Sequence, residues 1–200
     1  MRNLPTLNDI KLLHLKYAPT PEAFDLVYGH CQIVWEVAKN LLDKSNSDTI
    51  DKDLVEVGCL LHDIGVYRLY DASGKIDHSS YIKHGILGHE LLENEGFDEA
   101  LCRFCSCHTG VGLTQQDVIA QQLQLPIKDY LASNAEERLV MYADKFHTKT
   151  DPPKFMTIET YSRKVGRFGE DKVEKFQGLV EEFGKPHLDP LARKHKAEVI

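Results

Sequence analysis

Apolar residues recur through most of the chain at steps of three and four positions, the spacing of a helix that buries one face. The clearest series begins after Pro21, which favours the first turn of a helix, and it predicts a helix over residues 21–41. Its apolar positions are Phe24, Val27, Cys31, Val34, Val37 and Leu41. The polar run at residues 45–48 is expected to end this helix.

The next apolar series predicts a shorter helix that stops at Gly65, and Asp51 or Asp53 can cap its first turn. Its apolar positions are Leu54, Val57, Leu60 and Leu61. Residues 66–78 are then expected to form a loop, because turn-forming residues gather there. These are Asp71, Ser73 and Gly74.

The rest of the chain continues the helical pattern. Ser79 or Ser80 is expected to cap a helix that ends at Gly96, and Thr114 opens a segment that resembles a capping box. Further helices are predicted over residues 99–107, 133–146, 155–167 and 170–183. The polar tail from Lys185 is expected to lie over the surface or to be partly mobile. No segment has a convincing strand pattern, so the predicted fold class is all-α.

Composition places the chain among soluble globular proteins. Its 200 residues fit one domain, with 42% hydrophobic and 28% charged residues. The 24 basic and 31 acidic side chains give a net charge of −7, so nucleic acid is not an expected partner. No apolar run predicts a membrane span, and the start lacks a secretory signal. Five cysteines do not form a disulfide framework, so a cytoplasmic location is expected. The residues leave a homodimer open.

Histidine and aspartate residues suggest a metal site. His62 and Asp63 are adjacent at the end of an apolar run, just before Gly65. Further candidate ligands are His30, His84, His108 and Asp144. Imidazole and carboxylate together suit Fe, Mn, Co, Ni or Zn better than Mg or Ca. Adjacent helical residues point about 100° apart, so Asp63 could bridge two ions while His62 serves one of them.

Two histidines compete for one position in this set. His84 and His89 are five residues apart, which places them about 140° apart on a helix, so they are not expected to serve the same metal. His84 is the preferred ligand, and His89 is kept in reserve.

The order His30, His62-Asp63, Asp144 on a helical chain resembles the HD-domain superfamily of metal-dependent phosphohydrolases, and His62-Asp63-Ile64-Gly65 matches its HDIG subgroup. The similarity covers roughly residues 25–150, within a single domain over residues 1–200 whose helical extension spans about 155–184. The resemblance implies a helical bundle around a mono- or binuclear site. Its implied metal ligands are His30, His62, Asp63, Asp144 and, for a second divalent transition metal, His84 and His108.

The resemblance also implies a reaction. A bound metal lowers the pKa of water, and two metals clamp phosphoryl oxygens, so the expected activity is hydrolysis of a nucleotide or other small phosphorylated metabolite. Asp63, Arg68 and Lys145 are the candidate catalytic residues. Many relatives have lysine directly after the HDIG glycine, where this chain has Val66, and Arg68 is the candidate to replace that lysine. Other cationic candidates are Lys83, His147 and Lys149.

Other interpretations remain beside this one. The same six ligands could hold a di-iron centre that oxygenates a substrate, or the domain could bind nucleotides for regulation without catalysis. Cys102, Cys105 and Cys107 precede His108 and invite a structural zinc site. Such sites usually pair two separated ligand couples, so buried reduced thiols are the preferred interpretation of the cysteines.

Overall fold

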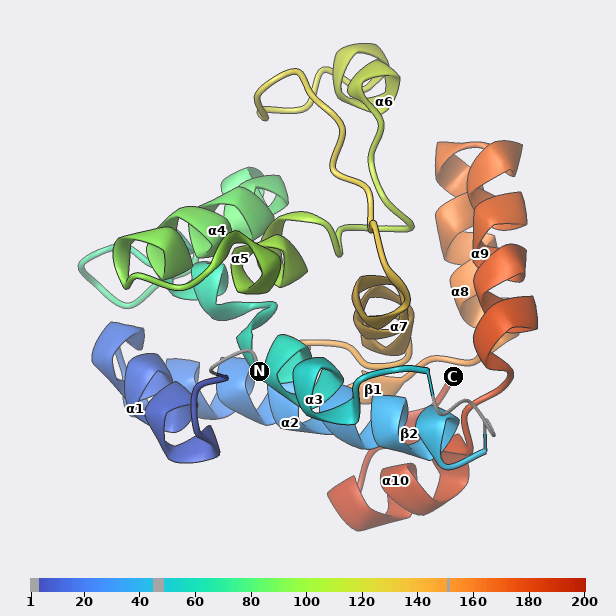
Figure 1. Cartoon of the computed structure of the whole chain (residues 1–200), viewed down its shortest axis with the longest axis horizontal. Helices are drawn as coiled ribbons and strands as arrows, with labels where there is room; N and C mark the ends of the chain where they lie inside the picture. The colour runs from blue at the N-terminus through green and yellow to red at the C-terminus, as the bar shows by residue number, and fades with distance from the viewer. Residues whose placement is uncertain (1–3, 45–48, 151) are drawn as a thin grey trace.

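Helices form almost all the regular structure of residues 4–44, 49–150 and 152–200, which are the residues that this computed structural model describes (Figure 1). The predicted all-α class is therefore confirmed. The α-helices are α1 (Leu7–Tyr17), α2 (Pro21–Leu42), α3 (Lys52–Leu61), α4 (His84–Asn94), α5 (Glu99–Ser106), α6 (Gln115–Ala120), α7 (Ala135–Asp144), α8 (Ile158–Val165), α9 (Glu170–Phe183) and α10 (Leu188–His195). The 3₁₀ helices are η1 (Ile64–Leu69), η2 (His78–Lys83) and η3 (Gly166–Phe168). Two short strands, β1 (Lys154–Phe155) and β2 (Glu198–Val199), pair in parallel.

The long helix α2 is the centre of the bundle. It packs against α3 and α7, while α4 packs against both α5 and η1 (Figure 1). Thr20 caps α2 by accepting a hydrogen bond from the Ala23 N–H, and Pro21 occupies its first turn, as the sequence predicts. The fully buried side chains of the core include Leu41, Leu61, Ile64, Leu91, Phe104, Leu139, Tyr142 and Phe146. Burial of these faces holds together the helices that carry the candidate ligands.

Glycines allow η1 and α4 to approach each other at backbone distance. A Cβ atom at Gly65 would lie 2.1 Å from the carbonyl oxygen of His84 and 2.2 Å from the backbone nitrogen of Gly88. A Cβ atom at Gly88 would in turn lie 3.0 Å from Cys105 on α5. The glycine of the HDIG motif therefore brings the start of α4, and with it His84, close to the residue pair His62-Asp63.

Three local predictions were wrong between residues 61 and 84. The helix expected to continue to Gly65 ends at Leu61, with His62 as its C-cap. The first four residues of the expected loop, 66–69, instead belong to η1, because their apolar side chains are drawn into the core; these are Val66, Tyr67 and Leu69. The turn predicted from Asp71, Ser73 and Gly74 is present. No serine caps α4, which begins at His84 after η2. Asp77, not Ser79 or Ser80, caps η2 by accepting from the Ser79 N–H at 2.9 Å.

The two ends of the described chain hold more structure than the sequence pattern indicated. The unpredicted helix α1 buries Ile10 and Leu13 against the bundle. The tail from Lys185 forms α10, which buries Leu188 and Ala192, and then β2. The expected break at residues 45–48 lies outside the described residues.

Residues 109–133, called the α6 arm below, extend away from the bundle with α6 near their tip (Figure 1). The arm has a small core of its own, formed by Leu113, Val118 and Tyr130. Thr114 and Asp117 form the predicted capping box at the start of α6. The buried ammonium of Lys172 on α9 contacts Asp117 at 2.7 Å and so joins the arm to the C-terminal helices.

Candidate metal centre

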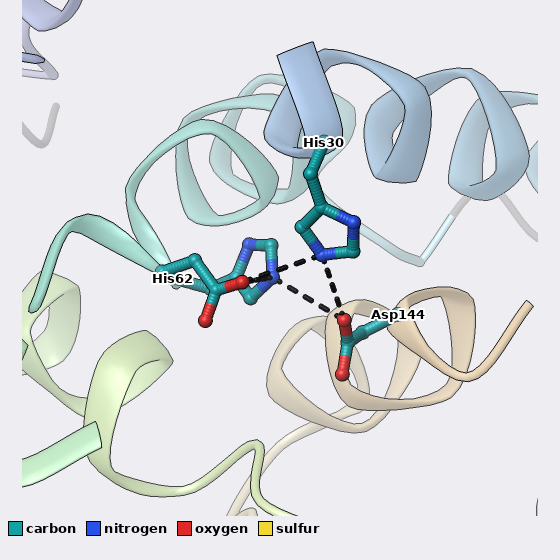
Figure 2. A group of neighbouring side chains, drawn as sticks. His30, His62 and Asp144 are labelled. Atoms are coloured by element: carbon teal, nitrogen blue, oxygen red, sulfur yellow. Dashed lines mark hydrogen bonds and ion pairs between the residues drawn. The ribbon is translucent and has the colours of Figure 1, made fainter. Parts of the chain in front are cut away.

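One group of candidate ligands gathers where three helices meet. His30 lies in the middle of α2, His62 caps the C-terminus of α3, and Asp144 is the last residue of α7; Figure 2 shows their side chains pointing toward one another. His30 Nε2 lies 3.0 Å from Asp144 Oδ1 and 3.3 Å from Asp63 Oδ2. His62 Nε2 lies 3.5 Å from each of the same two oxygens. These four residues can hold one metal ion.

Asp63 also belongs to a second group, with His84 and His108. Its other oxygen, Oδ1, lies 3.5 Å from the Nε2 atoms of both histidines, and these two nitrogens are 3.0 Å apart. One carboxylate oxygen thus faces each group, the arrangement that a bridging ligand requires. The structure brings together all six residues that the resemblance implied.

Backbone carbonyl groups fix the orientation of three of the four imidazoles. The Nδ1 atoms of His62, His84 and His108 lie 2.7, 2.7 and 3.0 Å from the carbonyl oxygens of Cys59, Tyr81 and Phe104. Each carbonyl lies three or four residues earlier in the chain, so local helical geometry supplies it. A proton on Nδ1 leaves the Nε2 lone pair free to face the cluster, as is usual for metal-ligating histidines.

The fourth imidazole is oriented by a side chain. His30 Nδ1 lies 2.8 Å from His147 Nδ1, so one of the two rings donates and the other accepts. If His30 Nε2 is to ligate a metal, it must carry the lone pair of the neutral ring. The proton is then on Nδ1, which donates the hydrogen bond to His147. His147 is buried beside the cavity described below.

The donor atoms of both groups fit a divalent transition metal. His62 Nε2 and Asp63 Oδ1 are buried and have no hydrogen-bond partner among the described residues. The Nε2 atoms of His84 and His108 lie 3.0 Å apart, so their lone pairs would repel each other unless a cation lay between the two nitrogens and nearby oxygens. Buried acceptors without a partner are costly, and a bound cation would remove that cost. Imidazole nitrogen with carboxylate oxygen suits Fe, Mn, Co, Ni or Zn.

Two lysines neutralise the carboxylates. Lys149 Nζ contacts Asp63 Oδ2 and lies 3.3 Å from His30 Nε2. Lys145 Nζ donates to Asp144 Oδ2 at 2.7 Å and to the carbonyl oxygen of His108 at 2.9 Å. Lys145, a predicted catalytic residue, therefore lies beside the candidate ligands, as does Lys149.

Charge and burial set the protonation states. Burial alone would raise the pKa of both carboxyl groups. Lys149 and the neighbouring histidines together hold the pKa of Asp63 well below the usual value, and Lys145, Lys149 and the neighbouring histidines do the same for Asp144. Burial lowers the pKa of His30 to about 4 and of His84 to about 3. These histidines are neutral at pH 7, and the carboxylates are ionised, as metal ligation requires.

His62 behaves differently. Burial acts to lower its pKa, but the charge of Asp63, together with Cys31 and the contact with Asp144, outweighs burial and raises the pKa of His62 well above the usual value. A metal ion would compete with this proton for the imidazole, so metal affinity is expected to rise with pH.

The candidate ligands adjoin a cavity of about 600 Å³, within the range of small-molecule sites. His84, His108 and Asp144 form part of its inner wall, with Lys145 and Lys149. The outer wall comes from the α6 arm and from the segment that follows α7. Its residues include Leu113, Leu123, Met156, Tyr161, Lys164, Val165 and Phe168.

Some candidates lie elsewhere. Arg68 is exposed, with its guanidinium 5.3 Å from the centre of the Tyr17 ring, and it does not line the cavity. Lys83 does not line the cavity either. His89 Nδ1 lies 3.0 Å from Ser106 Oγ and its Nε2 lies 3.2 Å from Glu99, so the structure brings His84, and not His89, to the cluster.

The cysteines before His108 do not join a metal group in the described part of the chain. Cys102, Cys105 and Cys107 are buried and unpaired, as the preferred interpretation expected. Burial raises the pKa of the Cys105 thiol well above its usual value, which makes it a poor ligand and nucleophile.

Sequence reasoning missed several cavity residues, among them Tyr81, Lys164 and Phe168. Tyr81 gave one signal, since it lies three residues before His84 and is able to orient it. Lys164 and Phe168 gave none, because their position depends on how α8 and η3 pack on a site formed by residues far earlier in the chain.

Comparison with known proteins identifies the family. The family model described as "HD domain" matches residues 27–149, more than half of the chain. An uncharacterised protein of Methanocaldococcus jannaschii is 39% identical over 127 residues, which cover 62% of this chain and 68% of that protein.

Two further relatives are named tRNA (cytidine(56)-2′-O)-methyltransferase. The one from Picrophilus torridus is 34% identical over 71% of this chain, and the one from Thermoplasma volcanium is 29% identical over 78%. The matched regions cover 40% and 41% of these relatives, so the chain spans well under half of their length.

Among solved structures, the HD domain of the Listeria monocytogenes phosphodiesterase PgpH gives a TM-score of 0.48 at 15% identity, covering 86% of this chain and 94% of that one. Its complex with cyclic-di-AMP gives 0.49, also at 15% identity, covering 86% and 92%. Within the described residues no helix has the length and apolar character needed to cross a membrane. The match of the family model over residues 27–149 shows that the chain belongs to the HD-domain family.

Proposed function

We propose that the protein is a metal-dependent phosphohydrolase that acts on a nucleotide or another small phosphorylated metabolite. Membership of the HD-domain family supports phosphohydrolase chemistry in general. The observation that carries the proposal is that Asp63 belongs to both ligand groups, and that these groups adjoin a cavity lined by lysines. His30, His62 and Asp144 would hold one ion with Asp63, and His84 and His108 would hold a second.

When bound, the metals supply a water of lowered pKa and positive charge for the phosphoryl oxygens. The chain's own residues do the rest. Asp63 is ionised and would help to hold the metals, because it belongs to both ligand groups. Lys145 and Lys149 bring ammonium groups to the inner end of the cavity, where they can stabilise negative charge that develops on the transferred phosphoryl group.

The outer cavity supports a substrate with an organic part beyond the phosphate. Lys164 adds a third ammonium to the lysines of the inner wall, which favours an anionic ligand. Tyr161, Val165 and Phe168 give the same cavity an apolar side, and Phe168 is 60% exposed. An aromatic ring and an anion-binding group at one opening suit a nucleotide, whose base can stack while its phosphate enters.

The test begins with protein purified without added metal. Elemental analysis should find near-stoichiometric Fe, Mn, Co, Ni or Zn, and the protein loaded with such a metal should release phosphate from a panel of nucleotides and from p-nitrophenyl phosphate. The panel should include cytidine 2′- and 3′-monophosphates, because two relatives are named for a reaction at a cytidine 2′-oxygen of tRNA.

A negative panel would separate the rivals. Tight iron with oxygen consumption and no phosphate release would favour the di-iron oxygenase. Nucleotide binding without any turnover, at full metal occupancy, would favour the regulatory domain. Folded protein that binds no divalent ion would remove the proposed site altogether.

A variant of Lys164 tests whether the outer cavity binds the nucleotide. In Lys164→Met, KM for the best nucleotide should rise about fivefold, equivalent to about 1 kcal/mol for an exposed ion pair, with kcat nearly unchanged. Lys175→Met, which changes an exposed lysine on α9 outside the cavity, is the matched control. An unchanged KM in Lys164→Met would contradict a role in substrate binding.

A further inference from the structure

Tyr81 places a buried hydroxyl group beside the candidate metal centre. The residue belongs to η2, three positions before His84, and its side chain lines the cavity. Its hydroxyl is buried, and no described residue accepts its proton. Burial raises the pKa of this hydroxyl, and the Lys149 ammonium beside it acts to lower that pKa. A buried hydroxyl proton without an acceptor is unfavourable, so its position at this cavity calls for an explanation.

The neighbours of Tyr81 fix its ring but leave its proton unused. The ring packs on His84 with a centroid separation of 4.8 Å, and the backbone carbonyl of Tyr81 accepts the hydrogen bond that orients His84. Lys149 Nζ lies 5.9 Å from the centre of the Tyr81 ring. An ammonium group can only donate, so Lys149 cannot accept the hydroxyl proton.

None of the nearby carboxylate oxygens of the described residues accepts a hydrogen bond from the Tyr81 hydroxyl. One oxygen of Asp63 contacts Lys149, and the other faces His84 and His108. The two oxygens of Asp144 face His30 and Lys145. The acceptor that the Tyr81 hydroxyl lacks is therefore expected to enter the cavity with a ligand.

We propose that the Tyr81 hydroxyl donates a hydrogen bond to a phosphoryl oxygen of the substrate, next to the Lys149 ammonium. This rests on the proposed function, because it names the group that the hydroxyl meets. Tyrosine is neutral at pH 7 and is a donor without a charge, so it can approach the cluster without repelling the cations. A donor held in advance beside the reacting group stabilises charge that develops there.

The packing of Tyr81 gives the proposal a geometric basis. The stack on His84 and the carbonyl bond to the same residue tie the hydroxyl to a candidate ligand of the second group. The ring therefore keeps its place relative to the cluster, and no loop has to close to position the donor.

The experiment compares Tyr81→Phe with Tyr70→Phe in metal-loaded protein. Both changes remove one hydroxyl, and Tyr70 is a half-buried tyrosine that does not line the cavity. Three quantities are measured: metal content, kcat/KM for p-nitrophenyl phosphate, and the Kd of inorganic phosphate by calorimetry. Unfolding by urea shows whether each variant keeps its fold.

In Tyr81→Phe, kcat/KM should fall about 10–100-fold, which is at or below the loss seen when a strong oxyanion donor is removed. The Kd of inorganic phosphate should rise at least about threefold. Metal content and the urea midpoint should stay close to those of the wild type. Tyr70→Phe should leave all these quantities unchanged.

Phosphate affinity and kcat/KM that both stay at wild-type values in Tyr81→Phe would overturn the proposal. So would a lower affinity explained entirely by lost metal, because Tyr81 would then act only through His84. A wild type that binds phosphate more tightly than Tyr81→Phe but hydrolyses no phosphate ester would leave the donor role standing and remove the proposed function instead.

Discussion

The inner and outer parts of the cavity differ in how firmly the fold holds their side chains. At the inner end, three imidazoles are oriented by backbone carbonyls within four residues, and the fourth by His147. At the outer end, Lys164 and Phe168 are exposed, and the structure gives Lys164 no ion pair among the described residues. The inner end is thus built to hold ions in one arrangement, while the outer end is left free to meet a ligand.

This difference separates chemistry from substrate choice. Groups that are fixed before a ligand arrives need no reorganisation during the reaction. Exposed groups on α8 and η3 can change between relatives without disturbing the ligands, which lie on other elements. A variant of a candidate ligand at the inner end should therefore alter metal content and turnover together, whereas a variant at the outer end should alter substrate affinity.

The strongest break at the inner end is Asp63→Asn. It removes the charge that faces both ligand groups, so both metals should be lost. Mutation of a group that only hydrogen-bonds a metal ligand typically lowers activity about 10–100-fold, and turnover of Asp63→Asn should fall by more than this. Metal content by mass spectrometry and the rate on p-nitrophenyl phosphate measure this.

His89→Gln is the matched control, because it changes a histidine of the same helix as His84 that lies away from the cluster. It should keep both metals. Two tightly bound ions in Asp63→Asn would show that the carboxylate is not shared.

Gly65→Ala should break the contact that holds His84 near Asp63. Its Cβ atom would meet the backbone of α4 at 2.1 Å, so η1 and α4 must separate. The free energy of unfolding should fall by about 1–3 kcal/mol, as for other overpacked positions, and the second metal should bind more weakly than the first. Urea denaturation and metal titration provide the measurements.

Gly178→Ala serves as the comparison for Gly65→Ala, because a Cβ atom there would meet nothing within 4 Å. This exposed position in α9 should gain up to about 1 kcal/mol of stability from helix propensity. Equal stability of the two alanine variants would rule out the close approach at Gly65.

The smallest effect concerns the wall of the outer cavity. Burial acts to raise the pKa of Asp117, but the bond from Lys172 and the capping bonds from Thr114 lower it to about 2. The folded-state pKa lies below the ordinary value of 3.8, so the pair stabilises the protein above about pH 4 and this stabilisation is lost as the pH falls toward 2.

Lys172→Met should therefore cost about 1 kcal/mol at pH 7, with a smaller difference from the wild type at pH 3. Urea denaturation at the two pH values gives both numbers, and Lys175→Met on the same helix should change neither. A difference that stays constant from pH 7 to pH 3 would show that the ion pair is not its source.

The sequence predicted the inner end better than the outer end for a physical reason. Residue types that bind metals are few, and His62-Asp63 placed one imidazole and one carboxylate at the same helix end. The order of the remaining histidines and Asp144 then supplied the resemblance, and the structure brings all six side chains together. Helical periodicity likewise indicated α2 and α7, which carry His30 and Asp144, and α3, which His62 and Asp63 follow directly.

Arg68 shows what periodicity cannot provide. A flexible loop after Gly65 would have let the guanidinium reach a phosphate. The apolar residues around it instead fold the segment into η1, and Arg68 is left exposed against Tyr17. The capping box at Thr114 predicted the start of α6, but the place of the α6 arm and η3 in the cavity wall was not predictable, since it depends on contacts between elements that are distant in the sequence.

Because the two oxygens of Asp63 face different ligand groups, the residue affects how metal ions would bind. A cation at Oδ2 would have to displace the ammonium of Lys149, and in doing so it would hold the carboxylate with Oδ1 turned toward His84 and His108. Lys149 already holds the carboxylate in this orientation before any ion binds, so metal uptake would exchange one cation for another at Oδ2 and would free the Lys149 ammonium for a ligand in the cavity.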